Sequence, residues 1–161
     1  AEYLEKMAAL RAARPGLSLT SDIIVGFPGE TEAEFLDTIS ILEEVRYDSV
    51  FSFAYSERPG TRAAAFADSV PEAERRRRLL HLNSVQDAIT SALLAECVGD
   101  ESEVLVLGPS ARDPNVLRGR TPEHRMVNFV GDAAVGELVQ VRIEAAGRHT
   151  LKGQQVIIHA A

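Results

Sequence analysis

Residues 19–35 read LTSDIIVGFPGETEAEF, and this stretch decides the fold of the first half of the chain. The β-branched residues 23–25 predict a strand, and the Gly/Pro segment 26–29 predicts a tight turn after it. Thr31 and Glu34 have the T-x-x-E spacing of a capping box, so a helix is expected to begin there. Because ligands bind at the carboxyl ends of strands in parallel α/β folds, we expect this turn to lie at a ligand site.

The composition limits the classes of protein that the chain can belong to. Its 161 residues are 45% hydrophobic, which is enough for one ordinary domain or two small ones. A formal net charge of -7 argues against a wholly basic nucleic-acid coat protein. Cys97 is the only cysteine, so the sequence offers neither a disulfide framework nor a ligand set for an iron–sulfur cluster, and we expect a reducing, cytoplasmic compartment. No apolar run is long enough to span a bilayer, and no membrane partner is expected.

The rest of the first half is predicted to repeat the helix–strand pattern. Residues 3–10 have one apolar helical face, and Pro15-Gly16 ends that helix. Residues 17–25 are expected to form the first strand, residues 35–45 a helix and residues 47–55 a second strand. The two strands are too far apart in sequence for a hairpin, so they should pair in parallel through a right-handed crossover.

A long helix is predicted from Ser69 and Glu72 to about Cys97, because apolar residues recur along it at helical spacing. The run Arg75–Arg78 lies near its start. Two interpretations stay open: a solvated helix face whose arginines pair with neighbouring glutamates, or a contact with nucleic acid.

Beyond residue 100 the pattern changes to short alternating strands separated by Gly, Pro and Asp. Five strands are expected, at residues 102–107, 115–120, 125–130, 138–145 and 149–158. This number and length of strands predict a small closed or half-open barrel of the OB-like kind.

Three motifs in order carry a resemblance to a known family. They are SDIIVGFPGET at residues 21–31, YSERPGT at 55–61 and GRTPEHRMVNF at 119–129. The chain resembles the later part of tRNA methylthiotransferases of the MiaB type, which are radical S-adenosylmethionine (SAM) enzymes. The resemblance implies an α/β plus all-β architecture. Residues 1–69 would be terminal αβαβ units of a partial radical-SAM (β/α) barrel, residues 70–98 a linker helix, and residues 99–161 a five-stranded antiparallel TRAM β-barrel that binds RNA.

The resemblance also implies an activity. Such enzymes add a methylthio group to carbon 2 of N6-isopentenyladenosine next to the anticodon of tRNA, with SAM and two [4Fe–4S] clusters as cofactors. The Cys-x-x-x-Cys-x-x-Cys motif that holds the radical-generating cluster is absent here. We therefore expect a segment of a longer enzyme, inactive alone, whose partners are the anticodon stem-loop and the missing N-terminal methylthiotransferase and barrel segments.

Carried over by motif, two groups of site residues follow from the resemblance. The SAM-binding residues would be Asp22, Ile24, Gly26, Phe27, Glu30, Ala54 and Tyr55. The substrate- and RNA-binding residues would be Ser56, Arg58, Thr61, Arg118, Arg120, Arg125, Asn128 and Phe129.

Structural alternatives stay open for some of these residues. Asp22 would then be an ordinary polar residue of the strand, Arg58 would form a salt bridge within its loop, and Phe129 would lie in the core, which its residue type favours. Neither Cys97 nor any of the four histidines is assigned chemistry.

Two other functions remain alternatives. A sister enzyme of the same family modifies an aspartate of a ribosomal protein, and the chain would also suit a stand-alone, non-catalytic RNA-binding module. Because a partial barrel leaves a strand edge unpaired, dimerisation through that edge is a further expectation.

Overall fold

The computed structural model describes residues 2–156, and its internal contacts divide the chain into two units, one ending at Ile89 and the other beginning at Thr90. The first unit contains the helices α1 (Glu2–Ala13) and α2 (Glu32–Val45), the strands β1 (Thr20–Val25) and β2 (Ser49–Ala54), a short 3-10 helix (Arg62–Ala65), and most of α3 (Glu72–Ala95). No helix within residues 2–156 combines the length and the apolar character needed to cross a membrane.

The two strands of the first unit pair in parallel, from Thr20 opposite Ser49 to Val25 opposite Ala54. This confirms the prediction made from the length of the crossover. The capping box is also confirmed: the Thr31 hydroxyl accepts the Glu34 N–H at 3.2 Å, and the Glu34 carboxylate accepts the Thr31 N–H at 2.8 Å. The local sequence therefore determines where α2 begins.

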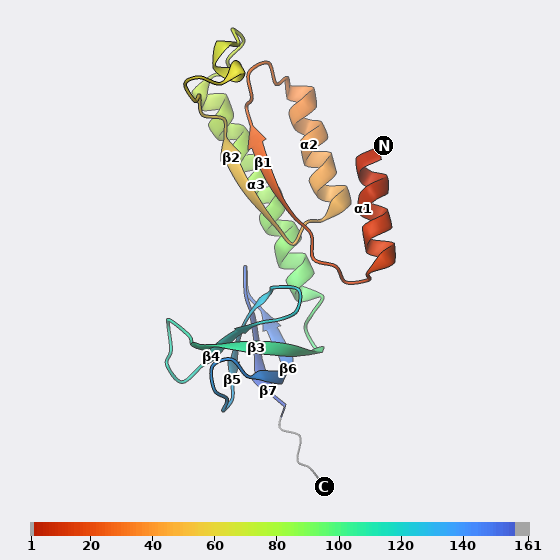
Figure 1. Cartoon of the computed structure of the whole chain (residues 1–161), viewed down its shortest axis with the longest axis vertical. Helices are drawn as coiled ribbons and strands as arrows, with labels where there is room; N and C mark the ends of the chain where they lie inside the picture. Colours follow the sequence, from red (N-terminus) through yellow and green to blue (C-terminus); the bar gives the residue numbers. More distant parts are fainter. Residues whose placement is uncertain (1, 157–161) are drawn as a thin grey trace. The chain divides into compact units, whose positions relative to one another are not determined.

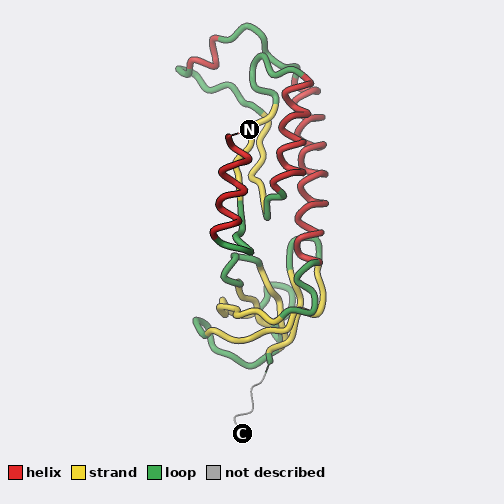
Figure 2. Tube along the Cα trace, turned by 90° about the vertical axis from the view of Figure 1, so that its right-hand side faces the viewer, coloured by secondary structure: helices red, strands yellow, loops and turns green. Residues whose placement is uncertain are grey.

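One face of the β1–β2 sheet is covered by helices, because α2 and α3 lie on the same side of the strand pair (Figures 1 and 2). The core of this unit includes Val25 from β1, Phe35 and Leu42 from α2 and Leu82 from α3, all of them fully buried. The opposite sheet face remains open within the described residues.

The second unit is a closed barrel with the strand order β3-β4-β5-β7-β6. The strands are β3 (Glu101–Pro109), β4 (Leu117–Arg120), β5 (Met126–Val130), β6 (Leu138–Ala146) and β7 (Leu151–Gln155). Its core is formed by inward residues of these strands, including Val104, Val127, Phe129, Val141 and Ile143. The predicted five-stranded barrel is thus confirmed, while the expected last two residues of its final strand, 157–158, lie outside the described residues.

The expectation of a wholly antiparallel barrel is wrong for one strand pair. β5 and β7 pair in parallel, from Val127 opposite Leu151 to Val130 opposite Gln154, whereas the other four pairs are antiparallel. The reason is geometric, since strand direction cannot alternate all the way around a closed ring with an odd number of strands.

Candidate functional site

The turn after β1 is fastened by its own glutamate and by an arginine of α3. The Glu30 carboxylate accepts the Gly26 N–H at 2.6 Å and the Arg78 Nη1 at 2.6 Å. Arg78 Nη1 also donates to the Glu30 carbonyl oxygen at 2.9 Å. The side chains of Arg78 and Glu30 are only 6% and 13% exposed, so this is a nearly buried ion pair that joins the turn to α3.

Two of the four arginines in the run on α3, Arg77 and Arg78, pair with acids of the same unit. Arg78 Nε donates to Glu74 at 2.9 Å, and Arg77 Nη2 donates to Glu32 at 2.6 Å and to Glu74 at 2.7 Å. These hydrogen bonds, from Arg77 first and then Arg78, lower the pKa of Glu74 to about 2. Burial alone would lower the pKa of Arg78, but its bonds to Glu30 and Glu74 outweigh burial and raise it. The expected pairing with neighbouring glutamates is present, but a solvated position is wrong for Arg78, because the turn covers it.

Arg75 connects the ends of the two strands. Its guanidinium donates to the Tyr55 carbonyl oxygen just after β2, and the Tyr55 N–H donates to the Val25 carbonyl oxygen at 2.8 Å. Gly26 has φ +70° and lies against the Arg75 side chain, which a Cβ atom at this position would overlap. A glycine is therefore required here both for the backbone conformation and for the close approach of α3.

The residues expected to bind SAM lie on different sides of the sheet. Asp22 and Ile24 are on the open face, opposite Phe51 and Phe53 of β2. Ile24, Phe51 and Phe53 are 55%, 64% and 55% exposed, so this face offers an apolar surface of the kind that covers a purine ring. Phe27, in the turn that follows β1, is 41% exposed. These side chains are compatible with an adenosyl group.

Glu30 and Ala54 do not join this face. The Glu30 carboxylate is occupied by the Gly26 N–H and Arg78, and Ala54 follows Phe53 and so points to the helix-covered side. The sequence suggested a ligand role for Glu30 only through its motif, whereas its contacts in the structure hold the turn in place.

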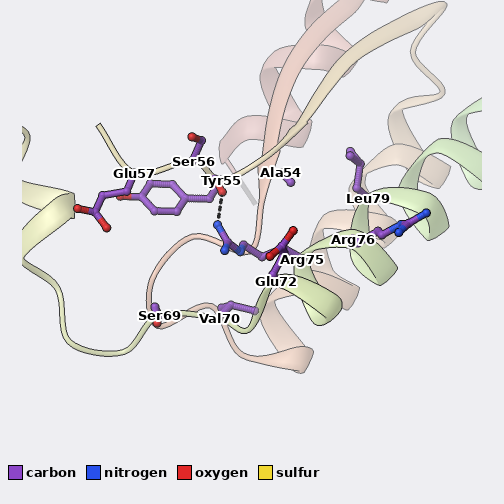
Figure 3. A pocket seen from close by; sticks show the side chains of 10 residues that line it. All are labelled: Ala54, Tyr55, Ser56, Glu57, Ser69, Val70, Glu72, Arg75, Arg76 and Leu79. Atoms are coloured by element: carbon purple, nitrogen blue, oxygen red, sulfur yellow. Dashed lines mark hydrogen bonds between the residues drawn. The ribbon is translucent and has the colours of Figure 1, made fainter. Parts of the chain in front are cut away.

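A pocket of about 670 Å³ lies between the end of β2 and the start of α3 (Figure 3). The expected site residues Ala54, Tyr55 and Ser56 line it, together with Arg75 and Arg76 of the arginine run, which the sequence analysis did not assign to this site. The Tyr55 hydroxyl and Arg75 Nε are buried and have no hydrogen-bond partner within residues 2–156.

Arg58 and Thr61 lie together in the exposed loop after β2. The Thr61 hydroxyl and N–H donate to the Arg58 carbonyl oxygen at 2.8 Å and 3.2 Å, which makes a local turn. Among the described residues, the Arg58 guanidinium forms no ion pair with Glu57 or Asp68, the alternative left open from sequence. Its charge is therefore directed to solvent.

The barrel separates the five residues expected to contact RNA. Arg118 and Arg120 are exposed on β4, and Asn128 of β5 lies directly opposite Arg118. Arg125 instead donates to Cys97 Sγ at 2.9 Å. Phe129 is 1% exposed in the barrel core, the alternative that its residue type favoured, so its ring offers no stacking surface.

Within residues 2–156 no three His, Cys, Asp or Glu side chains are grouped so as to hold a metal ion. The Cys97 thiol lies within the barrel unit, with Arg125 Nη1 and the Leu93 carbonyl oxygen as neighbours. The described part of the chain therefore offers no ligand set for an iron–sulfur cluster.

Comparison with known proteins identifies relatives of both units of the chain. Residues 95–156, which contain the whole barrel, match the family model of the TRAM domain, so the second unit is a TRAM domain. The chain is 49% identical over 160 residues to a tRNA-2-methylthio-N(6)-dimethylallyladenosine synthase of Myxococcus xanthus, an alignment covering 98% of the chain and 35% of that protein. It is 46% identical over 155 residues to the synthase of the same name from Alkalilimnicola ehrlichii, covering 96% of the chain and 35% of the relative. The synthase of Burkholderia mallei is 44% identical over 163 residues, covering 98% of the chain and 36% of that protein.

Over nearly its whole length the chain is thus similar to one part of the tRNA methylthiotransferases that these synthases represent. It spans about 35% of the length of the curated relatives it matches.

Proposed function

We propose that the chain serves in a radical-SAM tRNA methylthiotransferase that adds a methylthio group to carbon 2 of N6-isopentenyladenosine beside the anticodon. The observation that carries this proposal is the similarity to synthases named for that product, which extends through both units at 44–49% identity. The ribosomal-protein alternative has no comparable support among these relatives.

In this proposal the first unit forms terminal αβ units of the radical-SAM barrel. The parallel β1–β2 pair with helices on one face has the geometry of such units, and its open apolar face would look into the barrel. α3 would be the linker helix that leads to the TRAM domain. The unpaired edge of each strand would be taken by the remaining barrel strands or, in the isolated chain, by a second copy.

The open face would hold part of SAM. Ile24 and Phe53 would cover the adenine and exclude water from one side of it, while Arg75 and Arg78 keep the segments after β1 and β2 in place. When bound, SAM together with its iron–sulfur cluster supplies the radical and the methyl group. The cluster ligands would come from other segments, so the 161 residues alone would be inactive, and the enzyme would work in the cytoplasm where tRNA is modified.

The second unit would bind the tRNA. TRAM domains bind RNA in the resembling enzymes, and Arg118 and Arg120 offer cations on the surface of this barrel. Arg58 and Thr61, exposed after β2, would lie near the substrate at the mouth of the SAM site.

A chimaeric enzyme tests the proposal. The matching segment of the Myxococcus xanthus synthase would be replaced by this chain, and the chimaera expressed in cells that lack the enzyme. Nucleosides from digested tRNA would then be analysed by mass spectrometry. We expect the 2-methylthio nucleoside to reappear, and not when the segment is simply deleted. A folded chimaera that leaves the tRNA unmodified but adds a methylthio group to a ribosomal protein would refute the tRNA assignment.

A further inference from the structure

The outer surface of the TRAM barrel has two faces of different charge. The outward positions of β4, β5 and β7 contain three cations and two amides but no carboxylate: Arg118, Arg120, Met126, Asn128, Val130, Lys152 and Gln154. The outward positions of β3 and β6 contain three carboxylates and one arginine: Glu101, Glu103, Leu105, Leu107, Leu138, Gln140, Arg142 and Glu144.

The single arginine of the β3–β6 face, Arg142, already has an ion-pair partner. Arg142 Nη2 donates to the Glu101 carboxylate at 2.6 Å. An RNA strand would therefore meet uncompensated carboxylates on the β3–β6 face and only cations and neutral groups on the β4–β5–β7 face. Charge complementarity selects the β4–β5–β7 face.

Three residues on the selected face form a straight row across neighbouring strands. Arg118 is directly opposite Asn128, and Asn128 is directly opposite Lys152. Because adjacent strands are about 4.8 Å apart, the two cations flank the amide over a span of roughly 10 Å. Among residues 2–156 none of the three side chains has a hydrogen-bond or ion-pair partner. Arg120, by comparison, donates to the His124 carbonyl oxygen at 2.9 Å.

The backbone beneath the row is closely packed. Gly119 follows Arg118, and a Cβ atom at this position would meet the Leu105 carbonyl oxygen at 2.5 Å. Gly153 follows Lys152 and lies equally tightly against the backbone of Arg142. The spacing of the row is therefore set by the barrel before any ligand binds, which lowers the entropic cost of binding.

We propose that Arg118, Asn128 and Lys152 form a contact for single-stranded RNA. Arg118 and Lys152 each bind a phosphate of the strand, and the Asn128 amide hydrogen-bonds to the nucleotide between them. The proposal rests on the proposed function of the barrel in binding tRNA. It adds Lys152, which no sequence motif indicated, and it excludes Arg125 and Phe129, which the motif did indicate.

The test measures binding of the 161-residue chain to a fluorescent anticodon stem-loop by anisotropy, between 50 and 200 mM salt, with a scrambled hairpin for comparison. Each phosphate contact to a single strand contributes about 0.7 to the slope of log affinity against log salt. We expect Arg118→Ala and Lys152→Ala each to reduce the slope by about 0.7, and the double variant by about 1.4. Asn128→Ala should weaken binding about fivefold without changing the slope, because it removes a neutral hydrogen bond.

Arg142→Ala is the matched control, since it removes one exposed arginine from the other face. We expect its slope to equal that of the unsubstituted chain. Thermal melting of each variant shows whether the barrel is still folded. The milder Arg118→Gln and Lys152→Gln substitutions remove the charge while keeping most of the side chain, so they separate loss of the RNA contact from unfolding of the barrel.

The outcomes distinguish the two proposals. If the chain binds the stem-loop but the double variant keeps the full slope, the row is refuted while RNA binding stands. If the folded chain binds neither RNA at any salt concentration, the RNA-binding role of this barrel fails, and the row fails with it.

Discussion

Substitution of Arg78 should destabilise the first unit more than any other change in the arginine run. Arg78→Ala removes the hydrogen bonds to the Glu30 carboxylate and carbonyl and leaves that carboxylate, 13% exposed, without its cation. Breaking a buried ion pair by removing one partner costs about 3–5 kcal/mol. The bond to Glu74 adds little, because the Glu74 side chain is 30% exposed and screened by solvent.

Tyrosine fluorescence during urea unfolding measures this loss. The chain has three tyrosines and no tryptophan, and Tyr3, Tyr47 and Tyr55 all lie in the first unit, so the signal reports that unit alone. We expect a large shift of the midpoint to lower urea for Arg78→Ala.

Arg77→Ala is the matched control. Arg77 also binds two glutamates, but its side chain is 47% exposed, so its removal should cost about 0.2–1 kcal/mol. Replacing both Arg78 and Glu30 by Met should recover much of the stability, because no charge is then left buried without a partner. Equal midpoints for Arg77→Ala and Arg78→Ala would show that the buried pair does not hold the turn.

Three further predictions follow from the described contacts. Thr31→Ala removes the side-chain half of the capping box with Glu34 and should lower the unfolding free energy by about 1 kcal/mol, measured by the same fluorescence assay; an unchanged midpoint would contradict this. Gly119→Ala places a methyl group 2.5 Å from a backbone carbonyl oxygen and should destabilise the barrel by about 1–3 kcal/mol, seen as an earlier loss of β-sheet circular dichroism, and a native-like melt would show that the strands separate easily. Burial, and after it the hydrogen bond with Tyr3, raise the pKa of Tyr47 above its usual value of 10.0. The contribution of Tyr47 to stability is therefore complete below about pH 10 and is lost as the pH rises through the pKa of the folded state. Tyr47→Phe should therefore flatten the alkaline loss of stability, and an identical pH profile for both proteins would rule out this residue as its source.

Local sequence signals determined much of the architecture. The T-x-x-E spacing at Thr31 is sufficient for the capping box, since its hydrogen bonds join residues only three apart. The connection between the strands 20–25 and 49–54 is too long for a hairpin and contains a helix, which favours parallel pairing. The alternation beyond residue 100 favours a barrel. The three motifs were sufficient to indicate the resemblance to tRNA methylthiotransferases.

Tertiary structure decided which charged groups act inside the molecule and which face solvent. The sequence of Arg75–Arg78 does not distinguish Arg78, which is buried against the turn after β1, from Arg76, because burial depends on how α3 packs against a segment more than 40 residues away. In the barrel, Arg125 lies in the same motif as Arg120 but contacts Cys97, and Lys152 lies in no motif but joins Arg118 and Asn128 through the parallel β5–β7 pair. That pair arises only because five strands close into a ring. Strand register therefore decides which residues lie side by side on the barrel surface. Register depends on the pairing of residues far apart in the chain, so it cannot be read from the local sequence.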